Sequence, residues 1–174
     1  MNATQTDGAD ALIAALMEIE RHVTSQGWDQ RARLFALVRT DELIRNEPSL
    51  AAHLSQGNPD SLSSVEQEDF VPGEDLRKTL EGISWPASVF GCAIALERSF
   101  LPKQYEAEMP VGDDAAAADF VAHHEKRQDL RVVAGALRDG SRHGVARLLS
   151  HPDDLLGGTD LAPELIDALA RTLA

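Results

Sequence analysis

The chain has 174 residues, and its 43% of hydrophobic and 26% of charged residues are typical of a globular protein rather than a disordered one. Its formal net charge of −13 would repel phosphate backbones, so we expect no nucleic-acid partner. No apolar run reaches the roughly 18 residues of a membrane helix and no signal peptide opens the chain, so we expect a cytoplasmic protein that does not bind membranes.

The N-terminal third is predicted to contain a helix, a strand and a second helix. Apolar residues recur at helical spacing over residues 9–25, and Gly27 can end that helix. The short apolar run within residues 32–39 predicts a buried strand. Thr40 is a typical N-cap residue, so a helix over residues 41–54 should follow.

Two short helices and a long strand are predicted in the middle of the chain. Ser63 and Glu66 have the spacing of a capping box, which predicts a helix over residues 64–70. A second short helix is expected over residues 74–82. Residues 88–99 alternate between larger and smaller apolar side chains, which is typical of a strand with both faces buried.

The C-terminal third is predicted to contain a β-hairpin between two helices. An alanine-rich helix is expected over residues 114–127, before hairpin strands at residues 129–138 and 141–149. Residues 150–160, with Pro and Gly among polar side chains, are predicted to be a loop. The closing helix should span residues 162–173, because Pro163 suits the first turn of a helix.

The Asp139–Gly140 dipeptide favours a two-residue turn of type I′, with Gly140 at a positive φ angle. In that register Val132 faces Arg147, and each face of the hairpin carries two arginines. The predicted pairs on the two faces are Arg131 with Arg142, and Arg138 with Arg147. We therefore expect the arginines to form local ion pairs with Asp or Glu rather than one broad anion-binding stripe.

Together these elements predict an α+β fold. Because the hairpin requires antiparallel pairing, we expect a two-layer sandwich with a mainly antiparallel sheet of about four strands. Residues 1–8 are polar and are expected to be disordered, and residues 9–174 are expected to form a single α+β domain.

Several short segments together resemble a family of uncharacterised proteins from high-GC Gram-positive bacteria, the actinobacteria. The segments that carry the resemblance are Gly27–Gln30, Arg33–Val38, Ser84–Val89, Glu97–Arg98 with Leu101–Pro102, and Asp129–Gly140. The resemblance covers most of the chain and implies a single cytoplasmic bacterial domain. That family has no assigned activity, so the resemblance carries over no catalytic residue.

The cysteine and histidine pattern predicts neither a metal nor a cofactor. Cys92 is the single cysteine, so a chain cannot form an internal disulfide or a zinc site built from its own cysteines. His124 and Glu125 begin the motif of a metalloprotease helix, but Gln128 stands where the second histidine is needed. The remaining alternative is a metal site that joins these histidines to His143 or His151.

Glu97 and Arg98, near the end of the predicted strand 88–99, are the charged pair best placed to bind a ligand. A carboxylate beside a guanidinium can orient a substrate or act as a base. With His124 and Arg131 they make up the predicted ligand-binding residues. The structural alternative is that one of the pair faces solvent while the other forms a salt bridge across the sheet, for example with Arg131. No residue is predicted to be catalytic, because neither a nucleophile elbow nor a phosphate loop is found.

Without a dense group of catalytic residues, the chain is best interpreted as a non-enzymatic protein-interaction or regulatory module. Its partner would be another protein or a second copy in a homodimer. The alternative is a small-molecule or anion-binding enzyme with a charged cleft beside the sheet. A large exposed apolar surface would favour the first interpretation, and a deep pocket with convergent charges would favour the second.

Overall fold

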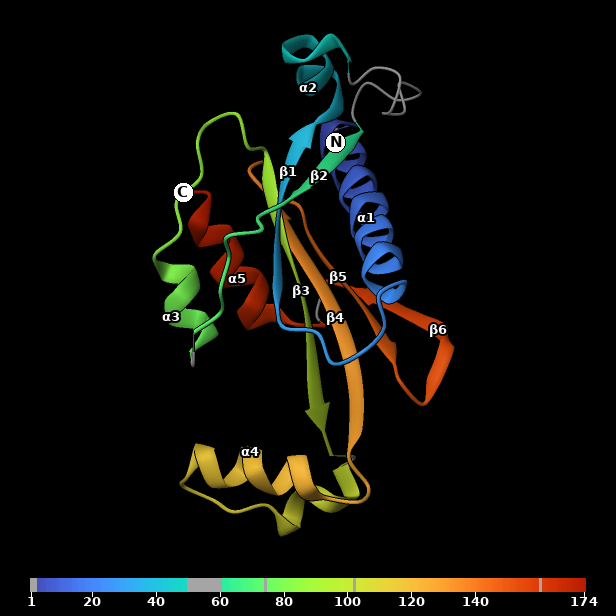
Figure 1. Ribbon diagram of the computed structural model, residues 1–174, viewed down its shortest axis with the longest axis vertical. Helices are drawn as coiled ribbons and strands as arrows, with labels where there is room; N and C mark the ends of the chain where they lie inside the picture. The colour runs from blue at the N-terminus through green and yellow to red at the C-terminus, as the bar shows by residue number, and fades with distance from the viewer. Residues whose placement is uncertain (1–2, 50–60, 74, 102, 160) are drawn as a thin grey trace.

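The structure is a computed structural model that describes residues 3–49, 61–73, 75–101, 103–159 and 161–174. At its centre lies an open sheet of six antiparallel strands in the order β2-β1-β3-β4-β5-β6 (Figure 1). The strands are β1 Arg33–Arg39, β2 Leu62–Glu66, β3 Gly91–Phe100, β4 Gln128–Leu137, β5 Arg142–Leu148 and β6 His151–Gly158. The predicted α+β class and antiparallel sheet are therefore confirmed.

Helices cover both faces of this sheet. The α-helices are α1 Ala3–Thr24, α2 Thr40–Asn46, α3 Leu76–Glu81, α4 Asp114–His123 and α5 Pro163–Thr172, and a 3₁₀ helix, η2, spans Lys103–Glu108. Figure 1 shows α1 on one side of the sheet and α3 with α5 on the other. None of the described helices is long and apolar enough to cross a membrane.

The predicted two-layer arrangement needs correction to three layers, because the central strands are apolar on both faces. Ala93 and Ala95 of β3 face α1 and join the cluster around Leu16. Cys92 and Ile94 face the other way, toward the cluster that includes α5. Since successive side chains of a strand point to opposite faces, one layer of helices would leave half of this apolar surface in water.

The predicted helices are present with different bounds. Helix α1 begins at Ala3, inside the segment predicted to be disordered, and Gly27 follows its end with a φ of 88°. The helix predicted over 41–54 is shorter, because α2 ends at Asn46 and residues 50–54 lie outside the described part. The other three predicted helices, over residues 74–82, 114–127 and 162–173, are present as α3, α4 and α5. Each is shorter than predicted.

Residues 64–70 do not form the predicted helix, because the segment Leu62–Glu66 is strand β2. β2 pairs with β1, and the backbone bonds of that pairing replace those of a helix. The two capping-box residues take other partners: the Ser63 hydroxyl contacts Thr40 at 2.8 Å, and Glu66 forms an ion pair with Arg33. Pairing with a neighbouring strand has overridden the local signal.

The prediction of a loop over residues 150–160 is also wrong, because residues 151–158 form the edge strand β6. Pro and Gly in this segment disfavour a strand when the local sequence is considered alone. The pairing with β5 forms nevertheless, with Leu156 opposite Ala146 and an irregularity between Arg147 and Leu148. The sheet therefore has six strands rather than about four, and the predicted strands 32–39, 88–99, 129–138 and 141–149 are β1, β3, β4 and β5.

The β4–β5 hairpin is confirmed, but its register differs by one residue from the prediction. Arg131 lies directly opposite Arg147, and Ala136 lies opposite Arg142. The loop has three residues, since the Leu137 N–H donates to the Ser141 carbonyl, and such loops commonly end with a glycine at positive φ. A shift by one residue moves a side chain to the other face, so Arg147 shares the α1 face with Arg131.

Arg138 bonds to backbone carbonyls rather than to the carboxylates that the sequence predicted. Its Nε donates to the Val89 carbonyl at 2.7 Å, and its Nη2 donates to the Pro86 carbonyl at 3.1 Å. Its Nη1 donates to the carbonyl of Leu173 at the end of α5. Arg142 does form an expected ion pair, with Asp167. Arg138 therefore ties the hairpin to the C-terminal helix.

Gly140 has a φ of 93°, as predicted, and an added Cβ would meet no atom within 4 Å. The cost of replacing it is therefore a backbone cost. Gly140→Ala should lower the free energy of unfolding by about 1–2 kcal/mol, because an L residue is strained in the left-handed region. The measurement is urea unfolding. Gly82, at a φ of −84°, is the matched control, and an equal loss for Gly82→Ala would contradict the assignment.

Candidate functional site

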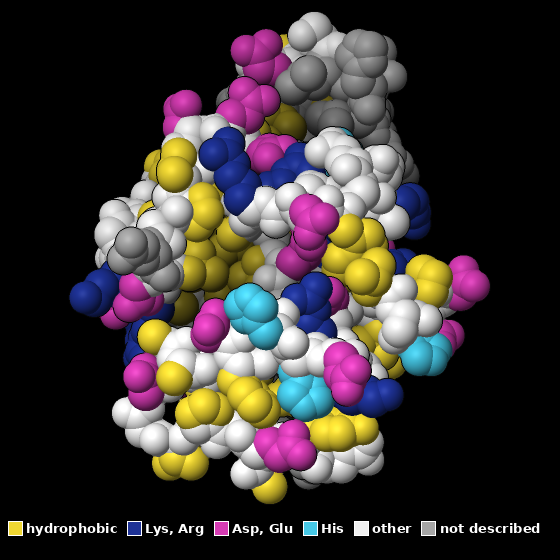
Figure 2. Space-filling model, turned by 60° about the horizontal axis from the view of Figure 1, so that its bottom comes forward, with side chains coloured by type: hydrophobic (Ala, Val, Ile, Leu, Met, Phe, Trp, Pro, Cys, Tyr) yellow, Lys and Arg dark blue, Asp and Glu magenta, His cyan; other side chains and the backbone are white. Residues whose placement is uncertain are grey.

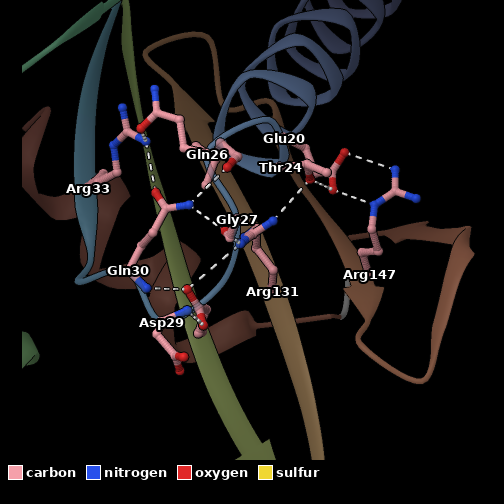
Figure 3. A network of polar contacts seen from close by, with 11 residues as sticks. Glu20, Thr24, Gln26, Gly27, Asp29, Gln30, Arg33, Arg131 and Arg147 are labelled. Carbon is pink, nitrogen blue, oxygen red and sulfur yellow. Dashed lines mark hydrogen bonds and ion pairs between the residues drawn. The ribbon is translucent and has the colours of Figure 1, made fainter.

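Glu97 and Arg131 are brought together on the α1 face as direct partners on β3 and β4. The distance between Glu97 Oε2 and Arg131 Nη2 is 3.8 Å, and the Arg131 side chain is only 1% exposed. This is the cross-strand ion pair that the structural alternative predicted. The pair is buried because α1 and the loop after it lie over this part of the sheet (Figure 3).

Arg131 also holds the C-terminal end of α1. Its Nη1 donates to the Thr24 hydroxyl at 3.0 Å, and its Nη2 donates to the Gly27 carbonyl. Its guanidinium lies 4.4 Å from the centre of the Trp28 ring, within the range of a cation–π contact. Burial lowers the pKa of Arg131, whereas the charges of Glu97 and Glu20 oppose that shift. A cation suits this place, because the C-terminal end of a helix carries partial negative charge.

The Glu97 carboxylate binds the backbone of the loop that follows α1. The Asp29 N–H donates to Oε1 at 2.9 Å, and the Gln30 N–H donates to Oε2 at 2.7 Å. Asp29 has a φ of 65°, an uncommon angle for a residue other than glycine. Both oxygens of Glu97 are thus engaged, which suits an anchor for the loop better than a base that accepts a substrate proton.

Charged side chains of both signs continue across the sheet from β2 to β5. Arg33 of β1 pairs with Glu66 of β2 at 2.5 Å, and Arg147 of β5 pairs with Glu20 of α1 at 2.5 Å. We name these residues the charged row, which consists of Glu66, Arg33, Glu97, Arg131, Arg147 and Glu20. Figure 3 shows the part of the row around the end of α1. Its three cations and three anions balance, so no excess positive charge remains to attract an anion.

The two outer carboxylates of the charged row are stabilised in their ionised form. Burial raises the pKa of Glu20, but hydrogen bonds from Arg147 and Thr24 and the nearby positive charges outweigh it, so the pKa lies below its usual value. The hydrogen bond from Arg33 lowers the pKa of Glu66, against a smaller opposing effect of burial. Sequence reasoning missed Glu20, because it was one of several acidic residues on a helix and only the fold brings it to β5.

A pocket of about 480 Å³ lies beside the charged row, at the ends of β3 and β4. Its lining has both signs of charge: Trp28, Asp29, Gln30, Glu97, Arg98, Ser99, Arg127, Asp129 and Leu149. Asp129 accepts a hydrogen bond from Ser99 and lies 3.8 Å from the Arg127 guanidinium. Two predicted ligand-binding residues, Glu97 and Arg98, therefore meet at this pocket, but several of its charges already have partners.

His124, the fourth predicted residue, lies away from this pocket at the C-terminal end of α4. Its Nδ1 accepts a hydrogen bond from the Lys126 N–H at 3.0 Å, and its Nε2 lies 3.4 Å from Glu108. Its ring packs near those of Tyr105 and Phe120. His124 thus takes part in the local packing of α4, and Figure 1 shows that this helix lies beyond the ends of β3 and β4.

The described residues contain no group of three or more His, Cys, Asp or Glu side chains that could hold a metal ion. Figure 2 shows one face of the molecule, on which Lys and Arg side chains are interspersed with Asp and Glu. No broad basic patch is visible among the described residues on that face. Neither observation points to a nucleotide or phosphate site.

Cys92 is fully buried against α5, where its thiol lies 3.5 Å from the Leu169 carbonyl and 3.4 Å from the Thr172 hydroxyl. Burial raises the pKa of Cys92 to about 11. Because the thiolate is the reactive form, the native thiol should react with a disulfide reagent at pH 8 at least about a hundredfold more slowly than the urea-unfolded chain. Equal rates for the native and unfolded chains would contradict this placement.

The edge strand β6 is a second candidate site, and it lies outside the cover of the helices. Six of its eight residues are exposed and the other two are half-buried, and Figure 1 shows the strand projecting from the body of the sheet. Within the part of the chain that the structure describes, β6 pairs with β5 and with no second strand. Its other side therefore presents backbone N–H and C=O groups that can pair with another strand.

The two halves of β6 differ in chemistry. The first half carries Pro152, Asp153 and Asp154, and the pairing irregularity also falls here. Proline, charge and bulges are the usual features that keep an edge strand from pairing. The second half, residues 155–158, is Leu-Leu-Gly-Gly and pairs regularly with β5, so it has none of these protections.

Exposed apolar side chains lie in the unprotected half of β6 and in the sequence on either side of the strand. Leu156 is 49% exposed, Leu149 in the turn before the strand is 45% exposed, and Leu161 after it is 38% exposed. Leu161 packs beside Gly144, which is the β5 partner of Gly158. Sequence reasoning missed this surface because it assigned residues 150–160 to a loop. The Leu-Leu pair within a segment rich in Pro, Asp and Gly was the signal that could have drawn attention to it.

Residues 12–174 match the family model described as "PPA1309-like protein". No curated protein and no solved structure matches the chain.

Proposed function

We propose that this chain, which belongs to the family of PPA1309-like proteins, is a non-enzymatic protein-interaction module whose strand β6 accepts an extended segment of a partner. Residues 155–158 of β6 carry the proposal. Among the described residues they leave one backbone edge unpaired, and they carry exposed Leu156 next to exposed Leu161. Strand addition to a sheet edge is a recurring mode of peptide recognition, in which the backbone supplies affinity and neighbouring side chains supply specificity.

The state of the charged groups supports binding rather than catalysis. A catalytic carboxylate needs a free oxygen within reach of the substrate. Both oxygens of Glu97 accept backbone N–H groups, and Glu20 is bound by Arg147 and Thr24. The proposal also includes a cytoplasmic location in an actinobacterial cell, which rests on the composition and on the sequence resemblance.

The proposal can be tested by selecting peptides from a random library on the immobilised chain. The selected peptides would then be added to the chain in solution, and backbone hydrogen exchange would be followed by mass spectrometry. We expect slower exchange in the segment that contains residues 155–158, because an added strand protects the outward N–H groups.

Leu156→Lys is the variant that should abolish this binding, because a charge on an edge strand opposes pairing. Val111, which is 99% exposed and lies just before α4, is the matched control as Val111→Lys. Binding that survives Leu156→Lys, or peptides that protect only other segments, would contradict the proposal.

The second candidate is a small-molecule or anion-binding enzyme that uses the pocket beside the charged row. The observation in its favour is that Glu97, Arg98 and the Trp28 ring line one pocket of about 480 Å³. A thermal-shift screen with small carboxylates, phosphate and amino acids would test it. This candidate predicts a saturable stabilisation that is lost in Arg98→Ala, whereas the interaction module predicts none.

A further inference from the structure

We propose that the segment accepted by β6 is basic and comes from a different protein, so that Lys or Arg residues flank its paired portion. This inference rests on the proposed function and names the chemistry of the partner. The argument depends on the charges at the two ends of the unprotected half of β6 and on the net charge of the chain.

Acidic side chains lie at both ends of the unprotected half. Asp153 and Asp154 precede it and are exposed. Beyond its other end, Leu161 packs beside Gly144, the partner of Gly158, and this contact brings the start of α5 close to the strand. Glu164 is exposed in the first turn of α5. In Figure 2, acidic side chains lie at the right margin, the side from which β6 projects in Figure 1.

The two arginines of β5 already have other partners. Arg147 attracts Asp153, but its guanidinium is already held by the buried Glu20 carboxylate and by the Pro152 carbonyl. Arg142, the exposed arginine of β5, forms an ion pair with Asp167. The edge therefore offers negative charge to an incoming strand.

A second copy of this chain fits the edge poorly. In an antiparallel pairing of residues 155–158 with the same residues of a second copy, Asp153 and Asp154 of each copy would flank the ladder. They would meet no Lys or Arg of the other strand, because β6 carries neither. Each copy also carries a net charge of −13, which slows and weakens their approach. A cationic segment meets none of these costs and gains attraction.

The side chains of the unprotected half indicate what should lie between the flanking cations. Gly157 and Gly158 have no side chains, so they leave space for residues of the added strand. Leu156 and Leu161 are exposed next to them and would pack against apolar residues. The matching partner is therefore a short apolar or β-branched stretch between Lys or Arg residues.

The test repeats the peptide selection on the wild type and on an Asp153→Asn, Asp154→Asn double variant. We expect peptides selected on the wild type to be enriched in Lys and Arg, and those selected on the double variant to lack this bias. A selected peptide should bind the double variant about tenfold more weakly, as expected for two exposed ion pairs. Replacing its Lys and Arg residues by Glu should weaken binding to the wild type at least as much, and added salt should reduce the difference.

The outcomes separate this inference from the proposed function. Peptides that protect residues 155–158 without any basic bias would overturn the basic partner and leave strand addition intact. A failure to select any peptide whose binding depends on Leu156 would overturn both. Sedimentation equilibrium of the wild type should give a monomer mass at micromolar concentration. A dimer that Leu156→Lys dissociates would show that the occupant is a second copy and would overturn the inference.

Discussion

Replacing Glu20 by Gln is expected to lower the free energy of unfolding by about 3 kcal/mol, which is the lower end of the range for breaking a buried ion pair. Glu20 is 2% exposed, and its carboxylate accepts hydrogen bonds from Arg147 and Thr24. Without it, Arg147 and the buried Arg131 would lie opposite one another on adjacent strands with no carboxylate between them. The measurement is urea unfolding followed by circular dichroism.

Glu18 supplies the matched control, since it is exposed on the same helix and Glu18→Gln should change stability by less than about 0.5 kcal/mol. Adding Arg147→Gln to the Glu20→Gln chain should restore part of the loss, because the unpaired cation is then removed as well. Equal effects of the Glu18 and Glu20 changes would show that the charged row contributes no net stability.

The same carboxylates should make stability depend on pH below about pH 4.5. The pKa values of Glu20 and Glu66 are lowered in the folded chain from an ordinary value of 4.5. A lowered pKa means that the stabilisation is complete above the pKa of the unfolded chain and is lost as the pH falls through the pKa of the folded chain. Urea unfolding from about pH 5.5 down to about pH 3 should show this decrease. The slope should be smaller for Glu20→Gln, and an unchanged slope would contradict the assignment.

Replacing Arg131 by Met should also destabilise the chain by about 3 kcal/mol, and it should change the environment of Trp28. The methionine can fill part of the space, but it cannot donate to Thr24 and Gly27 or pair with Glu97. The end of α1 and the following loop would lose their attachment to β4. Removing one partner of a buried pair costs several kcal/mol even when the volume is kept.

Fluorescence can report the loss at Trp28 directly. In a Trp85→Phe background, Arg131→Met should shift the Trp28 emission to longer wavelength, because the indole loses the guanidinium 4.4 Å from its ring and becomes more hydrated. Arg98→Met is the matched control, since Arg98 is exposed on β3 and lines the same pocket. A similar emission and stability for both variants would contradict a structural role for Arg131.

Part of the site could be predicted from the sequence. The alternation over residues 88–99 and 129–138 predicts buried strands, and a salt bridge from this site to Arg131 across the sheet is one of the alternatives that the sequence leaves open. Glu20 and Trp28 were not placed at the site. They join it only because α1 packs across the sheet, and the spacing of apolar residues on a helix does not specify which strands the helix will cover.

The sequence by itself determined the features that depend on a few neighbouring residues. Gly140 has the positive φ that its dipeptide indicated, and Asp75 and Asp113 cap helices that the local sequence also predicted. Backbone preferences of this kind act within a turn, so they are visible in a short stretch of sequence. Apolar periodicity similarly identified the four inner strands and the α+β class.

Only the tertiary structure decided the two edge strands and the register of the hairpin. Ser63 and Glu66 had a helical capping pattern, but pairing with β1 made them part of β2. Residues 151–158 became a strand because β5 offered a free edge. The one-residue difference in register placed Arg147 beside Arg131. The Glu20 carboxylate forms an ion pair with Arg147, and its negative charge also acts on Arg131. Pairing, register and the burial of charge depend on contacts between distant parts of the chain, and local preferences that differ by about 1 kcal/mol per residue cannot decide them.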